Sequence, residues 1–112
     1  MHRMQKYENP GGYGRVKLLS DGRQALVYDD GGQCKIRFKQ PKAKVFASPI
    51  VVATPPAGAH YTNAELIELQ DGTLIYAWNH RWDTKIKVKY SFDGGNTWKY
   101  EQTLYEQKWE SD

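Results

Sequence analysis

The most constraining feature of this chain is an internal repeat at an offset of fifty residues. The two copies share apolar residues, a turn-forming Asp-Gly pair and a Lys-Ile pair at one constant spacing. The matched residues are Val16 with Leu66, Leu19 with Leu69, Asp21-Gly22 with Asp71-Gly72, Tyr28 with Trp78, Lys35 with Lys85, and Ile36 with Ile86. A repeat of this length is typical of a supersecondary unit that stacks on further copies, because one copy alone cannot bury its hydrophobic face.

Each copy predicts four β-strands and shows no helical period. We expect strands at about 13–20, 23–29, 34–40 and 45–53 in the first copy, and at about 61–69, 73–79, 84–91 and 99–106 in the second. The third strand of each copy alternates between apolar and basic residues, which predicts one buried and one wet face. The second strands, around 25–28 and 74–78, are apolar on both faces. They are therefore expected to belong to sheets that have neighbours on both sides.

Residues 91–98 match a compact turn motif, S-x-D-x-G-x-T-W. Its specified residues are Ser91, Asp93, Gly95, Thr97 and Trp98. The hydroxyl and carboxylate can bond the local backbone, the glycine supplies a positive φ, and the indole can pack back onto the sheet. The first copy has lost this motif, because aligning Phe46 with Trp98 requires a deletion of two residues. The motif predicts a structural turn and not an active site.

The octet is the Asp box of sialidase-type β-propellers, a family of glycoside hydrolases and sugar-binding relatives, and the chain resembles this family over about residues 12–106. Residues 61–72 are similar to the blade that carries N-x-E-L-I-x-L-x-D-G in bacterial sialidase-like hydrolases, and residues 12–18 resemble the blade before it. The resemblance implies an all-β fold of two four-stranded antiparallel blades. Residues 1–112 would form one two-blade unit, with blade 1 at about 12–56 and blade 2 at about 60–108.

Two blades cannot close a propeller, which needs about four to eight. We favour completion by self-association with cyclic symmetry, in which three chains give six blades. The alternative is that the rest of a longer chain supplies the missing blades. A third alternative is a sandwich of the eight strands, which needs no partner but leaves the repeat unused.

Polar residues gather where the first strand of each copy starts and where the second strand turns into the third. The ligand-binding residues expected there are Arg15, Asn63, Glu65, Asn79, Arg81 and Trp82. Arg15 and Glu65 are repeat equivalents at the head of an innermost strand, and an arginine fork suits the carboxylate of an acidic sugar. Trp82, Tyr61 and Tyr13 are expected as flat platforms for a sugar ring. Alternatively, Glu65 pairs with Arg15 or Arg81 across the blade interface.

Glycoside hydrolysis needs two carboxyl groups, or a nucleophile and an acid, at a defined spacing. The candidate carboxylates are Asp29, Asp30, Glu65 and Asp83. Residues 29–32, Asp-Asp-Gly-Gly, are more simply a turn. The resemblance implies a tyrosine nucleophile activated by a glutamate, but the later blades that would carry this tyrosine and further arginines are absent from the sequence. Complete catalytic machinery is therefore not expected in this chain.

The composition limits the binding partners and cofactors that we expect for this chain. A net charge of +3 is mild, so nucleic acid is not an expected partner, although Lys85, Lys87 and Lys89 would serve one. No apolar run is long enough to span a membrane. The single cysteine, Cys34, is expected in the core, and no residues show metal-ligand spacing, so we expect no metal and no cofactor. Without a signal-peptide pattern the default location is cytoplasmic, whereas a trimmed fragment of a longer protein would be secreted or periplasmic.

Three functions remain in competition at this stage. The favoured function is a carbohydrate-binding, sialidase-like propeller module. The second is part of an exo-glycoside hydrolase, which activity on a fluorogenic glycoside would reveal. The third is a structural or protein-interaction propeller, which is favoured if Arg15 and Glu65 are occupied by pairing with each other.

Overall fold

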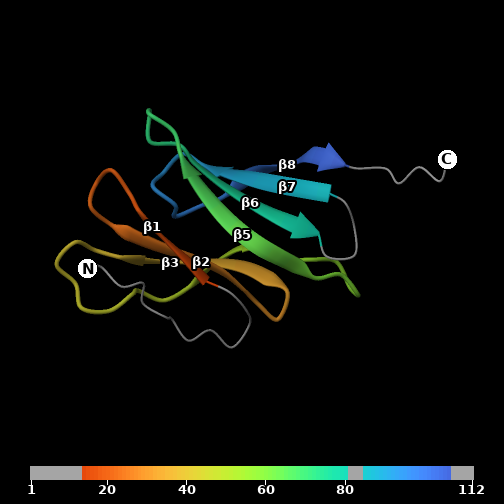
Figure 1. Ribbon diagram of the computed structural model, residues 1–112, viewed down its shortest axis with the longest axis horizontal. Helices are drawn as coiled ribbons and strands as arrows, with labels where there is room; N and C mark the ends of the chain where they lie inside the picture. The colour runs from red at the N-terminus through yellow and green to blue at the C-terminus, as the bar shows by residue number, and fades with distance from the viewer. Residues whose placement is uncertain (1–13, 81–84, 107–112) are drawn as a thin grey trace, which may run out of the picture.

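A computed structural model describes residues 14–80 and 85–106, which form two four-stranded antiparallel sheets (Figure 1). The first sheet contains β1 (Gly14–Leu18), β2 (Gln24–Asp30), β3 (Gln33–Lys39) and β4 (Ile50–Ala53), and the second contains β5 (Tyr61–Glu68), β6 (Leu74–His80), β7 (Lys85–Ser91) and β8 (Lys99–Glu106). In both sheets the strands lie in chain order, as a meander. These residues include no helix, and so none that could cross a membrane. The predicted all-β chain with two four-stranded antiparallel sheets is confirmed.

The observed strands match the expected ranges closely except at the fourth strand of the first copy. A strand was expected over 45–53, but β4 begins only at Ile50. Pro49 precedes it and has no N–H to donate to a strand ladder. The guanidinium of Arg37 donates from Nε to the carbonyl oxygen of Ala47 at 2.7 Å, and the Ala47 N–H donates to the carbonyl oxygen of Phe38 at 2.7 Å. These bonds hold the irregular segment 40–49 against β3.

The Asp-Gly turns of the two copies have the same geometry. Gly22 and Gly72 adopt φ values of 93° and 92°, a left-handed conformation that glycine accepts without steric cost. In the first turn the Arg23 N–H donates to Asp21 Oδ1 at 3.0 Å, and in the second the Thr73 N–H donates to Asp71 Oδ1 at 2.9 Å. The fifty-residue repeat in the sequence is therefore also a repeat of hydrogen bonds.

A hydrophobic core lies between the two sheets. Its buried residues are Leu19, Ala25, Val27, Cys34, Ile36, Phe38, Val52, Ala53, Tyr61, Ala64, Leu66, Leu74, Tyr76 and Trp78. The Tyr76 hydroxyl crosses from β6 to the first sheet, where it lies 2.8 Å from the carbonyl oxygen of Lys35 and 3.1 Å from that of Tyr28. One hydroxyl proton is shared between these acceptors. Cys34 is fully buried, as expected, and burial raises the pKa of its thiol.

The turn at residues 91–98 is fixed by a network centred on one carboxylate. Asp93 Oδ1 accepts from the Ser91 hydroxyl at 2.8 Å and from the N–H groups of Asn96 and Thr97 at 3.1 and 3.0 Å. Asp93 Oδ2 accepts from the Thr97 hydroxyl at 2.7 Å. Trp98 Nε1 donates to the carbonyl oxygen of Gly95 at 2.9 Å. The sequence motif therefore performs the structural task predicted for it.

This turn also docks on the first sheet. Gly95 has φ 99°, and a Cβ atom at this position would overlap the ring of Phe38. Arg23 stacks over the same Phe38 ring at 4.6 Å and donates from Nη1 to the carbonyl oxygen of Gly94 at 2.9 Å. The Trp98 ring meets the edge of Tyr76 at 5.8 Å between centroids. The turn thus closes one end of the shared core.

Asp93 makes the stability of this turn dependent on pH. The hydroxyl and N–H of Thr97, with the Ser91 hydroxyl, hold the pKa of the Asp93 carboxyl well below its ordinary value of 3.8. A lowered pKa means that the carboxylate stabilises the fold above pH 3.8 and that this contribution is lost as the pH falls further. We expect Asp93→Asn to lower the melting temperature at neutral pH, and the gap from the wild type to shrink below pH 3.8.

Thermal unfolding at a series of pH values measures this gap. Asp21 and Asp71 also have lowered pKa values, caused first by the N–H groups of Arg23 and Thr73, and both the wild type and the Asp93→Asn variant retain them. Their contribution cancels in the comparison. A gap that stays constant from neutral pH to well below 3.8 would contradict the assignment to Asp93.

Candidate functional site

A β-bulge in β5 shapes the surface where polar residues were expected to gather. Thr62 pairs with Asn79 and Glu65 pairs with Ala77, so three steps along β5 face two along β6. Within the bulge Asn63 adopts φ 57°, a left-handed conformation for which asparagine is enriched. The extra residue reverses the alternation of β5 between its two ends. As a result, the side chains at 61 and 65 face opposite sides of the sheet.

This reversal corrects the expectation for Tyr61. The sequence placed Tyr61 beside the site as a platform for a sugar ring, but its side chain is buried, with 3% exposed. Its ring packs 5.2 Å from the ring of Trp78 and 5.4 Å from that of His80. Burial raises the pKa of the Tyr61 hydroxyl. Tyr61 is therefore a core residue.

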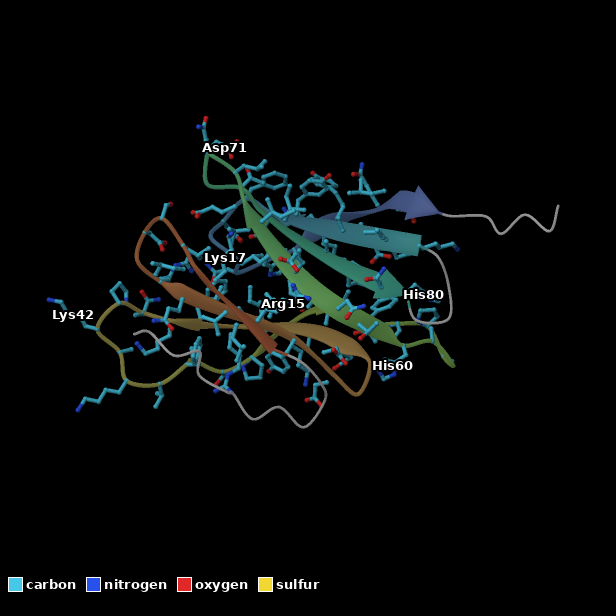
Figure 2. All side chains as sticks on the ribbon, in the orientation of Figure 1. Arg15, Lys17, Lys42, His60, Asp71 and His80 are labelled. Carbon is cyan, nitrogen blue, oxygen red and sulfur yellow. The ribbon has the colours of Figure 1, made fainter. Side chains whose placement is uncertain are left out.

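The repeat equivalents Arg15 and Glu65 form an ion pair between the two sheets. Arg15 Nη1 donates to Glu65 Oε1 at 2.7 Å, and the side chains remain 59% and 53% exposed. Figure 2 shows Arg15 between the sheets, where β1 lies against β5. An exposed pair of this kind stabilises a fold by about 0–1 kcal/mol. Its larger effect is on the site, because it places a guanidinium and a carboxylate side by side with little net charge.

A second contact fixes β5 against the first sheet, three residues after Glu65. The Glu68 carboxylate accepts from the Ser20 hydroxyl at 2.7 Å and from the Ser20 N–H at 3.0 Å. Ser20 belongs to the first Asp-Gly turn, so this contact lies at the turn end of the molecule. Figure 2 shows Asp71 at that end and His60 and His80 at the opposite end. The two contacts set the position of β5 along its length.

An open pocket of about 430 Å³ lies beside the Arg15–Glu65 pair. It is lined by Arg15, Asn63, Glu65, Ala77, Trp78, Asn79 and Ile86. Four of the expected binding residues, Arg15, Asn63, Glu65 and Asn79, therefore come together at one place. Ala77, Trp78 and Ile86 were not expected here. The repeat indicated inward-facing apolar residues at two of these positions, since Ala77 and Ile86 correspond to Val27 and Ile36 in the first copy.

The structure separates the candidate carboxylates. Asp29 is buried in the first sheet, with 5% exposed, and its Oδ2 lies 3.7 Å from Nε2 of His60. Asp30 follows it on the opposite face of β2 and pairs with Lys35 Nζ at 2.9 Å. Neither residue lines the pocket. Glu65 is the only carboxylate among the described residues that does.

The remaining expected residues lie outside the described part of the chain. These are Tyr13, Arg81, Trp82 and Asp83. Within residues 14–80 and 85–106, no group of three His, Cys, Asp or Glu side chains is arranged to hold a metal ion.

No protein-family model matches the chain, and a search of curated proteins found no match.

Proposed function

We propose that this chain is a two-blade unit of a sialidase-like propeller and that it binds carbohydrate at the pocket beside Arg15 and Glu65. The propeller assignment is supported by the two meander sheets, by the repeated Asp-Gly turns and by the Asp93 network of the Asp box. Propeller blades are four-stranded antiparallel sheets of this kind, packed face to face. The proposal gives each sheet the role of one blade.

The observation that carries the binding proposal is the ion pair beside an apolar floor. Arg15 presents the remaining N–H groups of its fork, and Glu65 presents its second oxygen, since one donor and one acceptor are used in the pair. The amides of Asn63 and Asn79 add donors and acceptors at the same pocket. Ala77 and Ile86 offer an apolar surface between these groups. Directional polar groups around apolar surface are the usual composition of a small-ligand site.

The charge of the pair favours neutral saccharides over acidic ones. The sequence suggested that Arg15 binds the carboxylate of an acidic sugar, but Glu65 already neutralises this guanidinium at 2.7 Å. A second carboxylate would be repelled by Glu65. Adjacent hydroxyls of a neutral sugar can instead donate to the carboxylate and accept from the guanidinium. We therefore propose neutral, hydroxyl-rich glycans as the ligand class.

A glycan array carrying neutral and sialylated glycans tests this proposal, followed by titration calorimetry with the best ligand. We expect Glu65→Gln to weaken binding by roughly tenfold to a hundredfold, because hydrogen bonds to charged groups are worth about 1.5–3 kcal/mol. The melting temperature should hardly change, since the side chain is exposed. Lys42→Ala is the matched control, because Lys42 is exposed in the irregular segment 40–49.

The alternative outcome has its own meaning. If the folded wild type binds no glycan on the array, the carbohydrate proposal is wrong. The Arg15–Glu65 pair would then serve only to join the sheets, and a structural or protein-interaction propeller would be the better assignment.

A further inference from the structure

The two sheets use opposite faces to contact each other. Directly paired residues in an antiparallel sheet share a face. In the first sheet Ala25 pairs with Phe38 and Val27 pairs with Ile36, and all four belong to the core between the sheets. In the second sheet the core side is formed by Leu66 and Tyr76, which pair with each other, together with Leu74 and Trp78. We call the face of each sheet that carries these core residues its near face, and the opposite face its far face.

The fifty-residue repeat shows that these near faces are different faces of the same unit. The counterparts of Ala25, Val27, Ile36 and Phe38 are Ile75, Ala77, Ile86 and Val88. Ala77 pairs with Glu65 and Val88, and Ile75 pairs with Ile67 and Tyr90, which places this set on the far face of the second sheet. Residues that bury the core in the first copy therefore have apolar counterparts that face away from it in the second.

The same relation holds in the other direction. The counterparts of Leu66, Tyr76 and Trp78 are Val16, Leu26 and Tyr28, which lie on the far face of the first sheet. On this face Leu18 and Val16 of β1 are 69% and 41% exposed, whereas Leu26 and Tyr28 of β2 are buried. On the far face of the second sheet Ile67 is 44% exposed. Each far face thus presents exposed apolar side chains along its first strand, β1 or β5, and is the repeat equivalent of a face already buried inside the molecule.

We infer that a second copy of this chain docks head to tail, with the far face of its first sheet against the far face of the second sheet. This contact would repeat between chains the packing that exists once within the chain. It is heterologous, since each copy uses two different surfaces, and such contacts generate rings when the rotation closes. The occupant is argued from continuity with the interface inside the molecule. The inference does not depend on carbohydrate binding.

Docking of a second copy would also repeat the Arg15–Glu65 ion pair between chains. Glu65 is the repeat equivalent of Arg15, and the pair spans the contact between the first and second copies of the repeat. A further step places Arg15 of the next chain beside Glu65, whose Oε2 makes no bond to the described residues. In a closed ring the two residues would alternate. Docking would cover the apolar floor of the pocket, because Ala77 and Ile86 lie on this far face and their counterparts Val27 and Ile36 are buried in the contact that exists. Association and glycan binding would therefore compete.

Two variants that each block one face test the inference without any sugar. Ile67→Lys places a charge on the far face of the second sheet, and Leu18→Lys places one on the far face of the first. Both residues are exposed, so each variant should fold. Val45→Lys is the control, since Val45 is 74% exposed in the segment 40–49 outside both sheets. Masses are measured by light scattering coupled to size exclusion over a concentration series, and folding by circular dichroism.

We expect the wild type and the control to exceed the chain mass of 12.9 kDa, and each face variant to run as a folded monomer. An equal mixture of the two face variants should form dimers of twice this mass, because one chain keeps the face that the other lacks. A wild type that stays monomeric would overturn the inference. A Leu18→Lys variant that assembles normally would also overturn it, because the contact would then join two copies of the same face. A mixture of the two face variants that remains monomeric would overturn it as well.

Discussion

Replacing Trp98 by alanine should lower the free energy of unfolding by about 3 kcal/mol, the lower end of the range for deleting a large aromatic side chain, because Trp98 is only partly buried. The indole contacts the edge of Tyr76 and donates to the carbonyl oxygen of Gly95, so its removal opens the end of the core that the turn at residues 91–98 closes. For a chain of this size the melting temperature should fall by roughly 10–20 °C. Thermal unfolding by circular dichroism measures it.

Trp98→Phe is the matched control for this change. It keeps an aromatic ring against Tyr76 but loses the bond from Nε1 to Gly95, which is worth about 1 kcal/mol. Protein concentration must be the same for all variants, because association shifts the apparent melting temperature. An unchanged melting temperature in Trp98→Ala would show that the turn does not hold the core closed.

Gly95→Ala should be the most costly glycine substitution in the chain that the structure describes. The new methyl group would overlap the Phe38 ring, and the left-handed φ of 99° is unfavourable for alanine. The backbone term costs about 1 kcal/mol and overpacking adds about 1–3 kcal/mol. We therefore expect a loss of about 2–4 kcal/mol in the free energy of unfolding, measured by denaturant titration.

Gly72→Ala separates the two terms of this prediction. Gly72 has a similar φ of 92°, but nothing lies within 4 Å of the position that its Cβ atom would occupy. It should therefore lose only the backbone term, about 1 kcal/mol. If Gly72→Ala and Gly95→Ala are equally destabilised, the close approach between Gly95 and Phe38 does not constrain the fold.

The strands were predictable because local signals and the repeat agree. The Asp-Gly pairs place two hairpin turns, the alternation over Lys85–Ser91 and Gln33–Lys39 marks half-buried strands, and the octet at 91–98 fixes a further turn. The fourth strand of the first copy was placed too early. There the S-x-D-x-G-x-T-W pattern of the second copy is missing, and the path of residues 45–49 depends on bonds from Arg37 and Ala47 to the backbone, which the sequence pattern does not show.

The candidate site was predictable in position but not in detail. The repeat placed Arg15 and Glu65 at equivalent strand starts, and both the ligand-binding and the pairing alternatives followed from that placement. The structure establishes the pair. Tyr61 could not be placed correctly, because a single bulge reverses its direction and no local residue pattern announces where an extra residue is accommodated. Asp29 was placed at the right end of the sheet, but it is buried there beside His60 from the connection between the two sheets, a neighbour that the sequence pattern does not show.

Because of the bulge at Asn63, the number of residues in β5 affects which polar groups line the pocket. β1 pairs regularly with β2 from Gly14 to Leu18, whereas β5 carries one extra residue. Removing a single residue there would restore a regular ladder without turning the flanking side chains, because Thr62 would still pair with Asn79 and Tyr61 with His80, so Tyr61 would stay in the core. In a lineage of such repeats, a one-codon deletion of Asn63 could therefore remove an amide from the pocket without disturbing the aromatic core residue beside it. Comparing related chains by their length in this strand would be as informative as comparing the amino acids they place there.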